Sequence, residues 1–211
     1  MWMPPTNPLV TSFDHLMADE NGLVGAAWTF CRIAHAGQVR KYTGEPYETH
    51  PREVAQRVHE AGGDEVMIAA ALLHDVVEDT CCTIQRLARF FPRPVAEMVG
   101  DLTDVPSEAP GNRRERKAAD RARLAAAGPA VHTIKLADIG HNTENIVAHD
   151  PHFSRLYLRE CALLLTVLDR GHRGLWRAAF GDIRAGAASL SVSLPEQDRL
   201  AELFCRPLAR D

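Results

Sequence analysis

The sequence has no run of about 18 consecutive apolar residues, the length that an apolar helix needs to cross a bilayer. Its first ten residues, MWMPPTNPLV, also lack the basic segment followed by an apolar stretch that marks a secretory signal. Both absences argue against membrane insertion and export. We therefore expect a cytoplasmic protein without a membrane partner.

An excess of positive charge is absent as well. The chain carries 24 Lys and Arg against 28 Asp and Glu, a formal net charge of −4. Proteins that bind nucleic acid usually present a clearly basic face, so we expect no nucleic-acid partner. The basic segment 113–123 lacks interleaved aromatic residues and is predicted to face solvent. The alternative is that this segment closes over an anionic ligand.

Cysteines are few and unpaired in pattern. There are 5, an odd number, and no two stand in a CxxC arrangement. This usage argues against a disulfide framework or a zinc knuckle, and it predicts free thiols. The chain has 211 residues, of which 45% are hydrophobic, so its composition is that of an ordinary globular protein with one core.

Helical periodicity dominates the chain. Val24, Ala27 and Cys31 follow the three- and four-residue spacing of one helical face. Asp64 and Thr83 are suitable N-caps, and the first of them is expected to open one continuous helix over residues 64–80. No series of alternating strand patterns, internal repeat or heptad run occurs. The predicted fold class is all-α, a single-domain bundle of roughly eight to ten helices.

The densest group of polar residues follows the apolar part of that predicted helix: His74, Asp75, Glu78 and Asp79. An isolated carboxylate in a core costs several kcal/mol, so these residues need partners. On a continuous helix, residues 74 and 78 share one column and residues 75 and 79 share the next. We expect His74 and Asp75 to bind a divalent cation, with Glu78 and Asp79 free to handle a water molecule.

Two more metal ligands are predicted elsewhere in the chain. His50 stands at the end of a Gly- and Pro-containing loop, just before a helix that we expect to begin at Pro51. Asp138 lies in the middle of an otherwise apolar helical segment. Two imidazoles and two carboxylates suit manganese, iron or zinc better than calcium.

Each of these residues also has a purely structural interpretation. His50 alone would more often be a hydrogen-bonded core residue, and Asp75 alone would more often cap a helix or pair with an arginine. Glu78 and Asp79 near a helix end are compatible with simple solvation. The metal site is the preferred interpretation, because the structural one requires four independent coincidences.

A basic pair, Arg40 and Lys41, lies in the loop that leads to His50. The plain interpretation is a solvated charge pair. The functional one is ligand binding, because an arginine plane stacks on a base or holds phosphate through two hydrogen bonds while lysine supplies a point charge.

Four phrases, AHAGQVRK, GEPYETHP, AALLHDVVEDT and KLADIGHN, occur in this order within residues 34–145. With them the sequence resembles the HD-domain phosphohydrolases and, among these, the hydrolase domain of the RelA/SpoT alarmone enzymes and their small stand-alone relatives. The resemblance implies an HD domain at residues 21–205, with C-terminal helices at 151–205, after an N-terminal extension at 1–20. It also implies a hydrolase-only form, because no room remains for the family's synthetase domain.

The resemblance further implies a role for each of three residue sets. The implied metal ligands, typically for manganese (Mn²⁺), are His50, His74, Asp75 and Asp138. The residues implied to activate the attacking water are Glu78 and Asp79. The implied contacts to the guanine nucleotide are Arg40 and Lys41, with Asn142 on the nucleoside. The implied reaction removes pyrophosphate from the 3′ position of ppGpp or pppGpp.

The chain departs from the family pattern at two positions. Ile139 stands where the family usually has a basic residue, and Glu144 stands where it often has arginine. Losing two cations weakens the expectation of a highly phosphorylated substrate. Three hypotheses stay open: a ppGpp pyrophosphohydrolase, the same chemistry on another nucleotide or phosphorylated metabolite, and a non-catalytic nucleotide-sensing module.

Two further features carry expectations. Gly140 weakens a helix interior by about 1 kcal/mol relative to alanine, so it predicts a close approach by a neighbouring group. The helices after Asp150 have three open roles: to complete the core, to cover the pocket, or to form a homo-oligomer face around Leu156, Leu158 and Leu164.

Overall fold

The computed structural model describes residues 12–106 and 108–205. This part of the chain forms twelve α-helices, and its one β feature is an isolated bridge between Val39 and Pro46. The all-α prediction is confirmed, and several short helices raise the number above the expected range. The helices are α1 (Phe13–Ala18), α2 (Leu23–Ala34), α3 (Thr49–Glu60), α4 (Glu65–Leu73), α5 (Val76–Asp79), α6 (Ile84–Phe90), α7 (Arg93–Leu102), α8 (Arg113–Ala126), α9 (Pro129–His149), α10 (Pro151–Leu165), α11 (Arg173–Ser189) and α12 (Gln197–Cys205).

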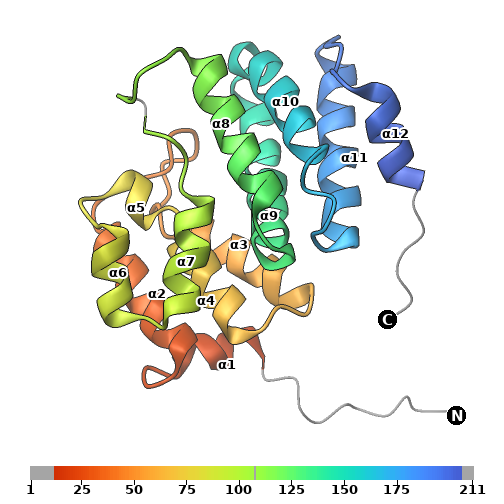
Figure 1. Ribbon diagram of the computed structural model, residues 1–211. Coiled ribbons are helices and arrows are strands. Elements are labelled where there is room, and N and C mark those ends of the chain that lie inside the picture. The colour runs from red at the N-terminus through yellow and green to blue at the C-terminus, as the bar shows by residue number, and fades with distance from the viewer. Residues whose placement is uncertain (1–11, 107, 206–211) are drawn as a thin grey trace, which may run out of the picture.

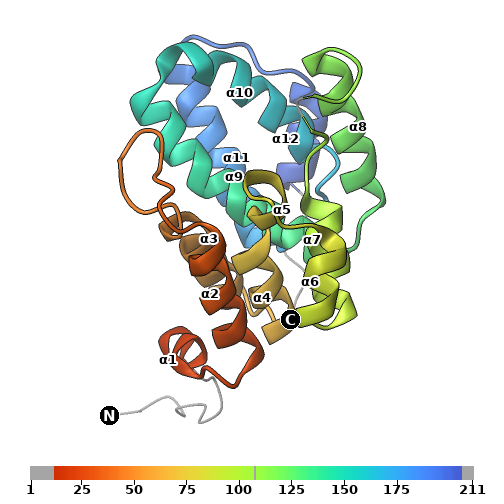
Figure 2. The same ribbon diagram turned by 90° about the vertical axis from the view of Figure 1, so that its left-hand side faces the viewer.

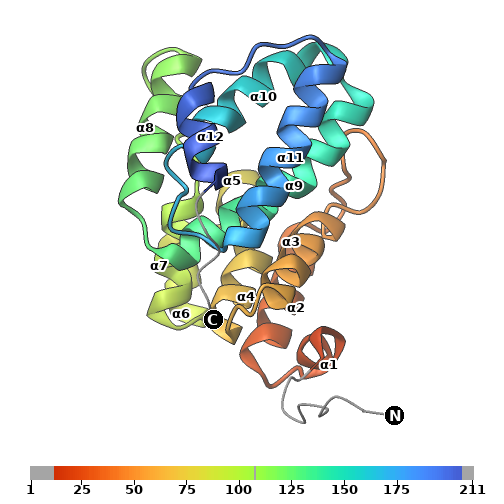
Figure 3. The same ribbon diagram turned by 90° about the vertical axis from the view of Figure 1, so that its right-hand side faces the viewer.

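The helices form two groups that share α9. Figure 1 shows α1 to α7 in the lower part of the molecule and α8 to α12 in the upper part. In the lower group α4 packs against α2, α3 and α7, whereas α9 packs against α3, α4 and α7 below and α10 and α11 above. The two side views show α9 passing through the middle of the molecule (Figures 2 and 3). A residue in the middle of α9 can therefore meet residues of the lower group.

Helix α4 is the centre of the lower group. Residues 68–73 are all buried, as expected for a helix that is apolar on every side. The predicted cap is present, because the side chain of Asp64 accepts a hydrogen bond from the Met67 amide at 2.9 Å. The Thr83 hydroxyl likewise accepts from the Arg86 amide at the start of α6.

The helix predicted over residues 64–80 is interrupted by a two-residue turn. Helix α4 ends at Leu73 and α5 begins at Val76, so His74 and Asp75 lie in the turn between them. The Nδ1 atom of His74 donates to the carbonyl oxygen of Ala71 at 2.7 Å, an acceptor that the Asp75 amide would use in a continuous helix. The interruption is slight, because His74 and Asp75 keep helical dihedral angles. The Asp79 amide still donates to the Asp75 carbonyl oxygen at 2.9 Å, so these two residues remain one turn apart.

Helix α3 begins earlier than predicted, at Thr49, so His50 lies in its first turn and not in the preceding loop. A turn at Pro46 starts the helix, because both the amide and the hydroxyl of Thr49 donate to the Pro46 carbonyl. Pro51 then needs no amide proton, since the first turn has no helical acceptor for one. The backbone of His50 is therefore part of the first turn of α3.

The C-terminal helices complete the core and cover a cavity. Leu158 is fully buried and Leu164 lines the cavity, whereas Leu156 is 46% exposed. The suggested homo-oligomer face around these three leucines is therefore wrong as defined, and the oligomeric state stays a prediction. At the other end, α1 packs on α2 and buries Phe13, while residues 1–11 of the suggested N-terminal extension lie outside the described residues.

Two expectations from composition can be checked directly. All five cysteines are free thiols, as predicted. Among the described helices none combines the length and the apolar character needed to cross a membrane.

Candidate metal centre and its cavity

The four predicted metal ligands meet between α3, α9 and the turn after α4. The Nε2 atom of His50 lies 3.4 Å from Oδ2 of Asp75 and 3.2 Å from Oδ1 of Asp138. The Nε2 atom of His74 lies 3.2 Å from Oδ1 of Asp75 and 3.7 Å from Oδ1 of Asp138. Ligand atoms of His50, His74 and Asp75 all lie within 4.8 Å of one another. Their side chains thus point at a common centre.

His74 offers a test of whether this centre suits a cation. Its Nδ1 donates to the Ala71 carbonyl, so Nε2 is left with a lone pair, and Nε2 is buried with no hydrogen-bond partner among the described residues. That lone pair faces carboxylate oxygens of Asp75 and Asp138. Lone pairs that face each other repel, and a bound cation removes the repulsion. The donor set of two imidazoles and two carboxylates therefore fits a divalent transition metal.

The titration of His74 points the same way. Burial acts to lower its pKa, but the carboxylates of Asp75 and Asp138 raise the pKa to about 9. The two carboxylates thus stabilise positive charge at this position. A divalent cation supplies that charge without a proton on the ring.

Asp138 is held by two neighbours on its own helix. Lys135 pairs with Oδ2 at 2.9 Å, and Asn142 donates from Nδ2 to Oδ1 at 2.7 Å. Burial acts to lower the pKa of Lys135, but Asp138, Asp104 and Glu78 raise it well above its usual value, so the lysine stays charged. These contacts turn Oδ1 of Asp138 toward both histidines.

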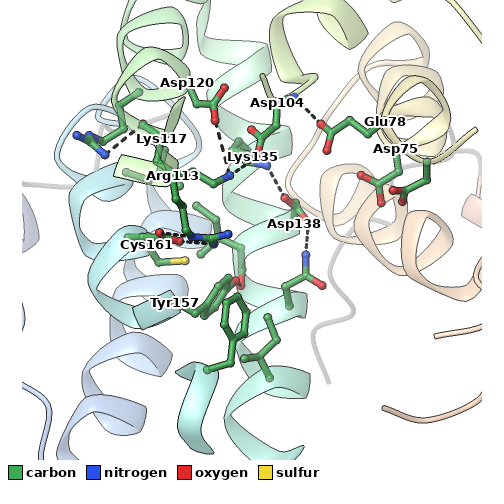
Figure 4. Close-up of a pocket in the computed structure, with 18 of the residues that line it drawn as sticks. Asp75, Glu78, Asp104, Arg113, Lys117, Asp120, Lys135, Asp138, Tyr157 and Cys161 are labelled. Atoms are coloured by element: carbon green, nitrogen blue, oxygen red, sulfur yellow. Dashed lines mark hydrogen bonds and ion pairs between the residues drawn. The ribbon is translucent and has the colours of Figure 1, made fainter. Parts of the chain in front are cut away.

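A cavity of about 310 Å³ opens beside the centre. One side, which we call the acidic wall, consists of Asp75, Glu78 and Asp79. On the opposite side, α8 contributes three basic residues, Arg113, Lys117 and Arg121, which we call the cationic wall. The buried carboxylate of Asp120 lies beside them and pairs with Lys117 and Arg123. Figure 4 shows Asp75 and Glu78 on one side and Arg113 and Lys117 on the other, with Lys135 and Asp138 between them. An apolar floor is formed by Ile139, Ile146, Phe153, Tyr157 and Leu164.

The cationic wall corrects one expectation. Segment 113–123 is predicted to face solvent, and much of it is exposed, yet Arg113, Lys117 and Arg121 also line the cavity. Helix α8 is held there by Leu124, which packs into the core, and by Asp120, whose Oδ1 accepts a hydrogen bond from the Val105 amide at 2.8 Å. The alternative interpretation, closure over an anionic ligand, fits this position better.

Glu78 is fixed at one oxygen and open at the other. Its Oε1 accepts a hydrogen bond from the Asp104 amide at 2.6 Å. Desolvation raises its pKa to about 7; Lys135 opposes this rise, while Asp104 and Asp75 add to it. For Asp79 desolvation also raises the pKa, and Tyr47 opposes the rise. Both carboxyls line the cavity, and Glu78, with a pKa of about 7, can exchange a proton near neutral pH.

Three further residues support this region and were not singled out from the sequence. The hydroxyl of Tyr47 donates to Oδ2 of Asp75 at 2.7 Å. The buried His35 ring stacks on Tyr47 with centroids 4.7 Å apart, and its Nδ1 contacts Oε1 of Gln38 at 2.8 Å. Gln38 in turn donates from Nε2 to the Asp79 carbonyl oxygen. The GEPYETHP phrase contained the tyrosine, but nothing in its spacing indicated contact with Asp75.

The residues predicted to bind substrate are only partly brought together. Arg40 and Asn142 line the cavity and contact each other, with Nη2 of Arg40 3.2 Å from Oδ1 of Asn142. Lys41 is 75% exposed and pairs with Asp150 at 3.6 Å, in a smaller neighbouring pocket. It does not line the cavity beside the metal centre.

The two departures from the family pattern differ in consequence. Ile139 is buried and lines the cavity, so an apolar group occupies that part of the surface. Glu144 points away, toward Arg57, whose Nη2 lies 2.9 and 2.8 Å from its two carboxylate oxygens. Gly140 has the expected close neighbour, since a Cβ there would lie 3.1 Å from Nη1 of Arg57. The negative charge of Glu144 is thus neutralised outside the cavity.

Comparison with known proteins locates this site in a family. A family profile described as "HD domain" matches residues 27–176, a range that contains all four predicted metal ligands. A "Probable guanosine-3′,5′-bis(diphosphate) 3′-pyrophosphohydrolase" of Synechocystis sp. is 36% identical over 158 residues, which are 74% of this chain and 20% of that protein. The "Bifunctional (p)ppGpp synthase/hydrolase SpoT" of Escherichia coli is 34% identical over 157 residues, 73% of this chain and 22% of that protein. The chain thus spans about a fifth of the length of these curated relatives.

A solved structure gives the same fold. It is described by the words "A metazoan ortholog of SpoT hydrolyzes ppGpp and plays a role in starvation responses". The TM-score is 0.57 at 24% sequence identity, and the match covers 86% of this chain and 93% of that one. At this identity the likeness supports the helical fold.

Proposed function

This chain belongs to the HD domain family, and we propose that it is a metal-dependent pyrophosphohydrolase that releases pyrophosphate from the 3′ position of ppGpp or pppGpp. The observation that carries the proposal is the convergence of His50, His74, Asp75 and Asp138 beside a cavity whose opposite side carries three basic residues. The names of the Synechocystis and Escherichia coli relatives supply the substrate class.

The proposed metal ligands are these two histidines and two aspartates. When bound there, a divalent cation would polarise a phosphoryl oxygen and lower the pKa of a water molecule. Manganese is our preferred ion because the donor set mixes nitrogen and oxygen, although the same set also suits iron and zinc.

The acidic wall supplies the proton chemistry of the proposal. With Oε1 bound to the Asp104 amide, Glu78 has Oε2 available to take a proton from the attacking water. A carboxyl with a pKa of about 7 takes up and releases a proton readily at neutral pH. Asp79 is the second carboxylate that orients this water, because it lines the same cavity next to Glu78.

The cationic wall and the floor bind the nucleotide. Arg113, Lys117 and Arg121 face the acidic wall, at the position where phosphate oxygens would need cations. Arg40 and Asn142 also line the cavity and are the proposed contacts to the nucleoside. The hydrogen bond that joins them would then be replaced in part by contacts to the ligand. Lys41, which pairs with Asp150, would have to leave that partner to contact a nucleotide.

The deciding experiment is product analysis with the manganese-loaded protein. We expect ppGpp to yield GDP and pyrophosphate, identified by mass. Glu78→Gln keeps an acceptor for the Asp104 amide but cannot take up a proton, so turnover should fall by about 10²- to 10⁴-fold with metal affinity unchanged. Release of monophosphate alone would contradict the choice of bond, and full activity in the variant would remove Glu78 from the chemistry.

A second function is supported by Ile139. Its apolar side chain lines the cavity where the family usually places a basic residue, so the site is less suited to the most highly charged ligands. The second candidate function is therefore the same hydrolytic chemistry on another nucleotide or on a phosphorylated metabolite. A substrate panel in which ppGpp has a low kcat/KM would favour it. A cytoplasmic location remains a prediction of the sequence.

A further inference from the structure

The packing of α3 against α9 contains two polar contacts outside the cavity. His50 and Arg57 lie on α3, seven residues or about two turns apart. His141 and Glu144 lie on α9, three residues apart. His50 contacts His141, and Arg57 contacts Glu144. The proposed function uses only His50 of these four residues, so the role of the other three is open.

The contact between the two histidines is close and directional. Their Nδ1 atoms are 2.6 Å apart, while the ring centroids are 4.9 Å apart and the ring planes differ by 25°. The distance between the two Nδ1 atoms is much shorter than the distance between the ring centroids. Both Nδ1 atoms therefore lie between the two rings. The imidazoles therefore meet edge to edge, in the geometry of one N–H···N hydrogen bond.

The direction of this hydrogen bond decides what His50 can do. The opposite ring atom of His50, Nε2, faces Asp75 and Asp138 at 3.4 and 3.2 Å. If His141 were the donor, a neutral His50 would carry its proton on Nε2 and could not bind a metal there. If His50 donates from Nδ1, its Nε2 lone pair is free and points at the proposed metal position.

The other contact holds His141 where it can accept. Arg57 crosses the backbone of α9 at Gly140, the residue before His141, and a Cβ there would lie 3.1 Å from Nη1. Beyond Gly140, Nη2 of Arg57 binds both carboxylate oxygens of Glu144. The Arg57 and Glu144 side chains are 27% and 51% exposed, and their contact joins α3 to α9 three residues beyond His141.

We propose that His141 is a positioning residue for the metal centre: its Nδ1 accepts the Nδ1 proton of His50 and thereby keeps Nε2 of His50 free to bind the cation. The Arg57–Glu144 pair, made possible by Gly140, holds the two helices in the register that this hydrogen bond needs. This inference rests on the proposed metal site. Metal-binding histidines commonly donate their second ring N–H to a fixed acceptor, and here that acceptor is a second imidazole.

The test compares two substitutions at one position. His141→Asn retains an acceptor oxygen close to the position of Nδ1, whereas His141→Leu removes the acceptor at similar size. His149→Leu is the matched control, because His149 lies on the same helix, is exposed and has no contact with the metal centre. Manganese affinity is measured by titration calorimetry of the full chain, and the melting temperature is measured without metal.

We expect His141→Leu to weaken manganese binding by about 10- to 100-fold, the usual effect of removing a partner of a metal-binding histidine. His141→Asn should recover most of this affinity, and His149→Leu should bind as the wild type does. At saturating manganese, kcat of His141→Leu should approach the wild-type value, since His141 touches neither wall of the cavity. A purely structural role would lower the metal-free melting temperature of both His141 variants without this difference in affinity.

Two results would overturn the inference, and they are distinguishable. Equal manganese affinity in wild type and His141→Leu, or equally weak binding in both His141 variants, would reject the positioning role and leave the proposed function intact. Failure of the wild type to bind manganese or another divalent ion would reject the metal site itself, and the inference with it.

Discussion

The two walls of the cavity are built differently. Behind the acidic wall, side chains are buried and depend on one another: the His50 and His74 side chains are 1% and 4% exposed, and both face Asp138. In the cationic wall, Arg113 is 47% exposed and Lys117 is 28% exposed. Each of these two cations already has a partner outside the metal centre, Glu160 and Asp104 respectively.

This difference predicts different responses to mutation. Removing a buried group that several others face leaves those groups unpaired, which costs the full desolvation of each. Removing a partly exposed cation loses its contribution to ligand binding and one ion pair at the edge of the cavity, which is a smaller loss. Substitutions behind the acidic wall should therefore abolish metal binding or activity. Substitutions in the cationic wall should lower ligand affinity by smaller steps.

The largest effect is expected at Asp138, where the two walls meet. Asp138→Asn keeps the shape of the side chain but removes the charge that Lys135 and both histidines face. Manganese affinity should fall by more than about 100-fold, beyond the usual effect of losing an indirect partner. Titration calorimetry measures this, with Asp182→Asn on α11 as a control for loss of a half-buried carboxylate elsewhere. Wild-type affinity in Asp138→Asn would show that Asp138 is not a ligand.

A smaller effect is expected from the cationic wall. Arg113→Ala should raise KM for ppGpp by about tenfold, equivalent to about 1.4 kcal/mol, with a smaller change in kcat. The difference should shrink at high salt, because partly exposed charges are screened. Arg114→Ala is the matched control, since Arg114 is the adjacent arginine of α8 and does not line the cavity. Equal KM values in the two variants would remove the cationic wall from substrate binding.

The smallest effect should come from a residue that supports the acidic wall only through helix α4. Asp64→Ala removes the side-chain cap on the Met67 amide and should lower the free energy of unfolding by about 1 kcal/mol. Urea unfolding measures this change. Manganese affinity and kcat should stay at wild-type values, because the cap lies at the opposite end of α4 from His74. A loss of metal binding would mean that the metal centre depends on the whole helix.

Much of the fold follows from local patterns in the sequence. The caps at Asp64 and Thr83 are present where predicted, and Val24, Ala27 and Cys31 are buried as their spacing indicated. The break between α4 and α5 was missed, because it depends on the hydrogen bond from the His74 ring to Ala71. Periodicity describes the backbone of a regular helix and carries no information on such competition by a side chain.

The acidic wall of the site could be predicted from the sequence better than the cationic wall. The acidic wall and its histidines could be selected because buried charges in apolar segments need partners, and Asp138 stood out for this reason. Lys135, three residues earlier in the same apolar segment, carried the same signal and could have been found as the partner of Asp138. Arg113 and Tyr157 gave no such signal. The sequence of a basic or an amphipathic helix is the same whether or not the helix lines a cavity.

The sequence by itself determined that this chain is helical and which charged side chains must find partners in its interior, because periodicity and the cost of burying charge act locally. Only the tertiary structure decided that α8 and α10 enclose the cavity, that Glu144 turns to Arg57, and that His141 meets His50. All of these contacts join residues that are far apart in the chain. The last two also depend on how α3 crosses α9. No local pattern specifies such a crossing.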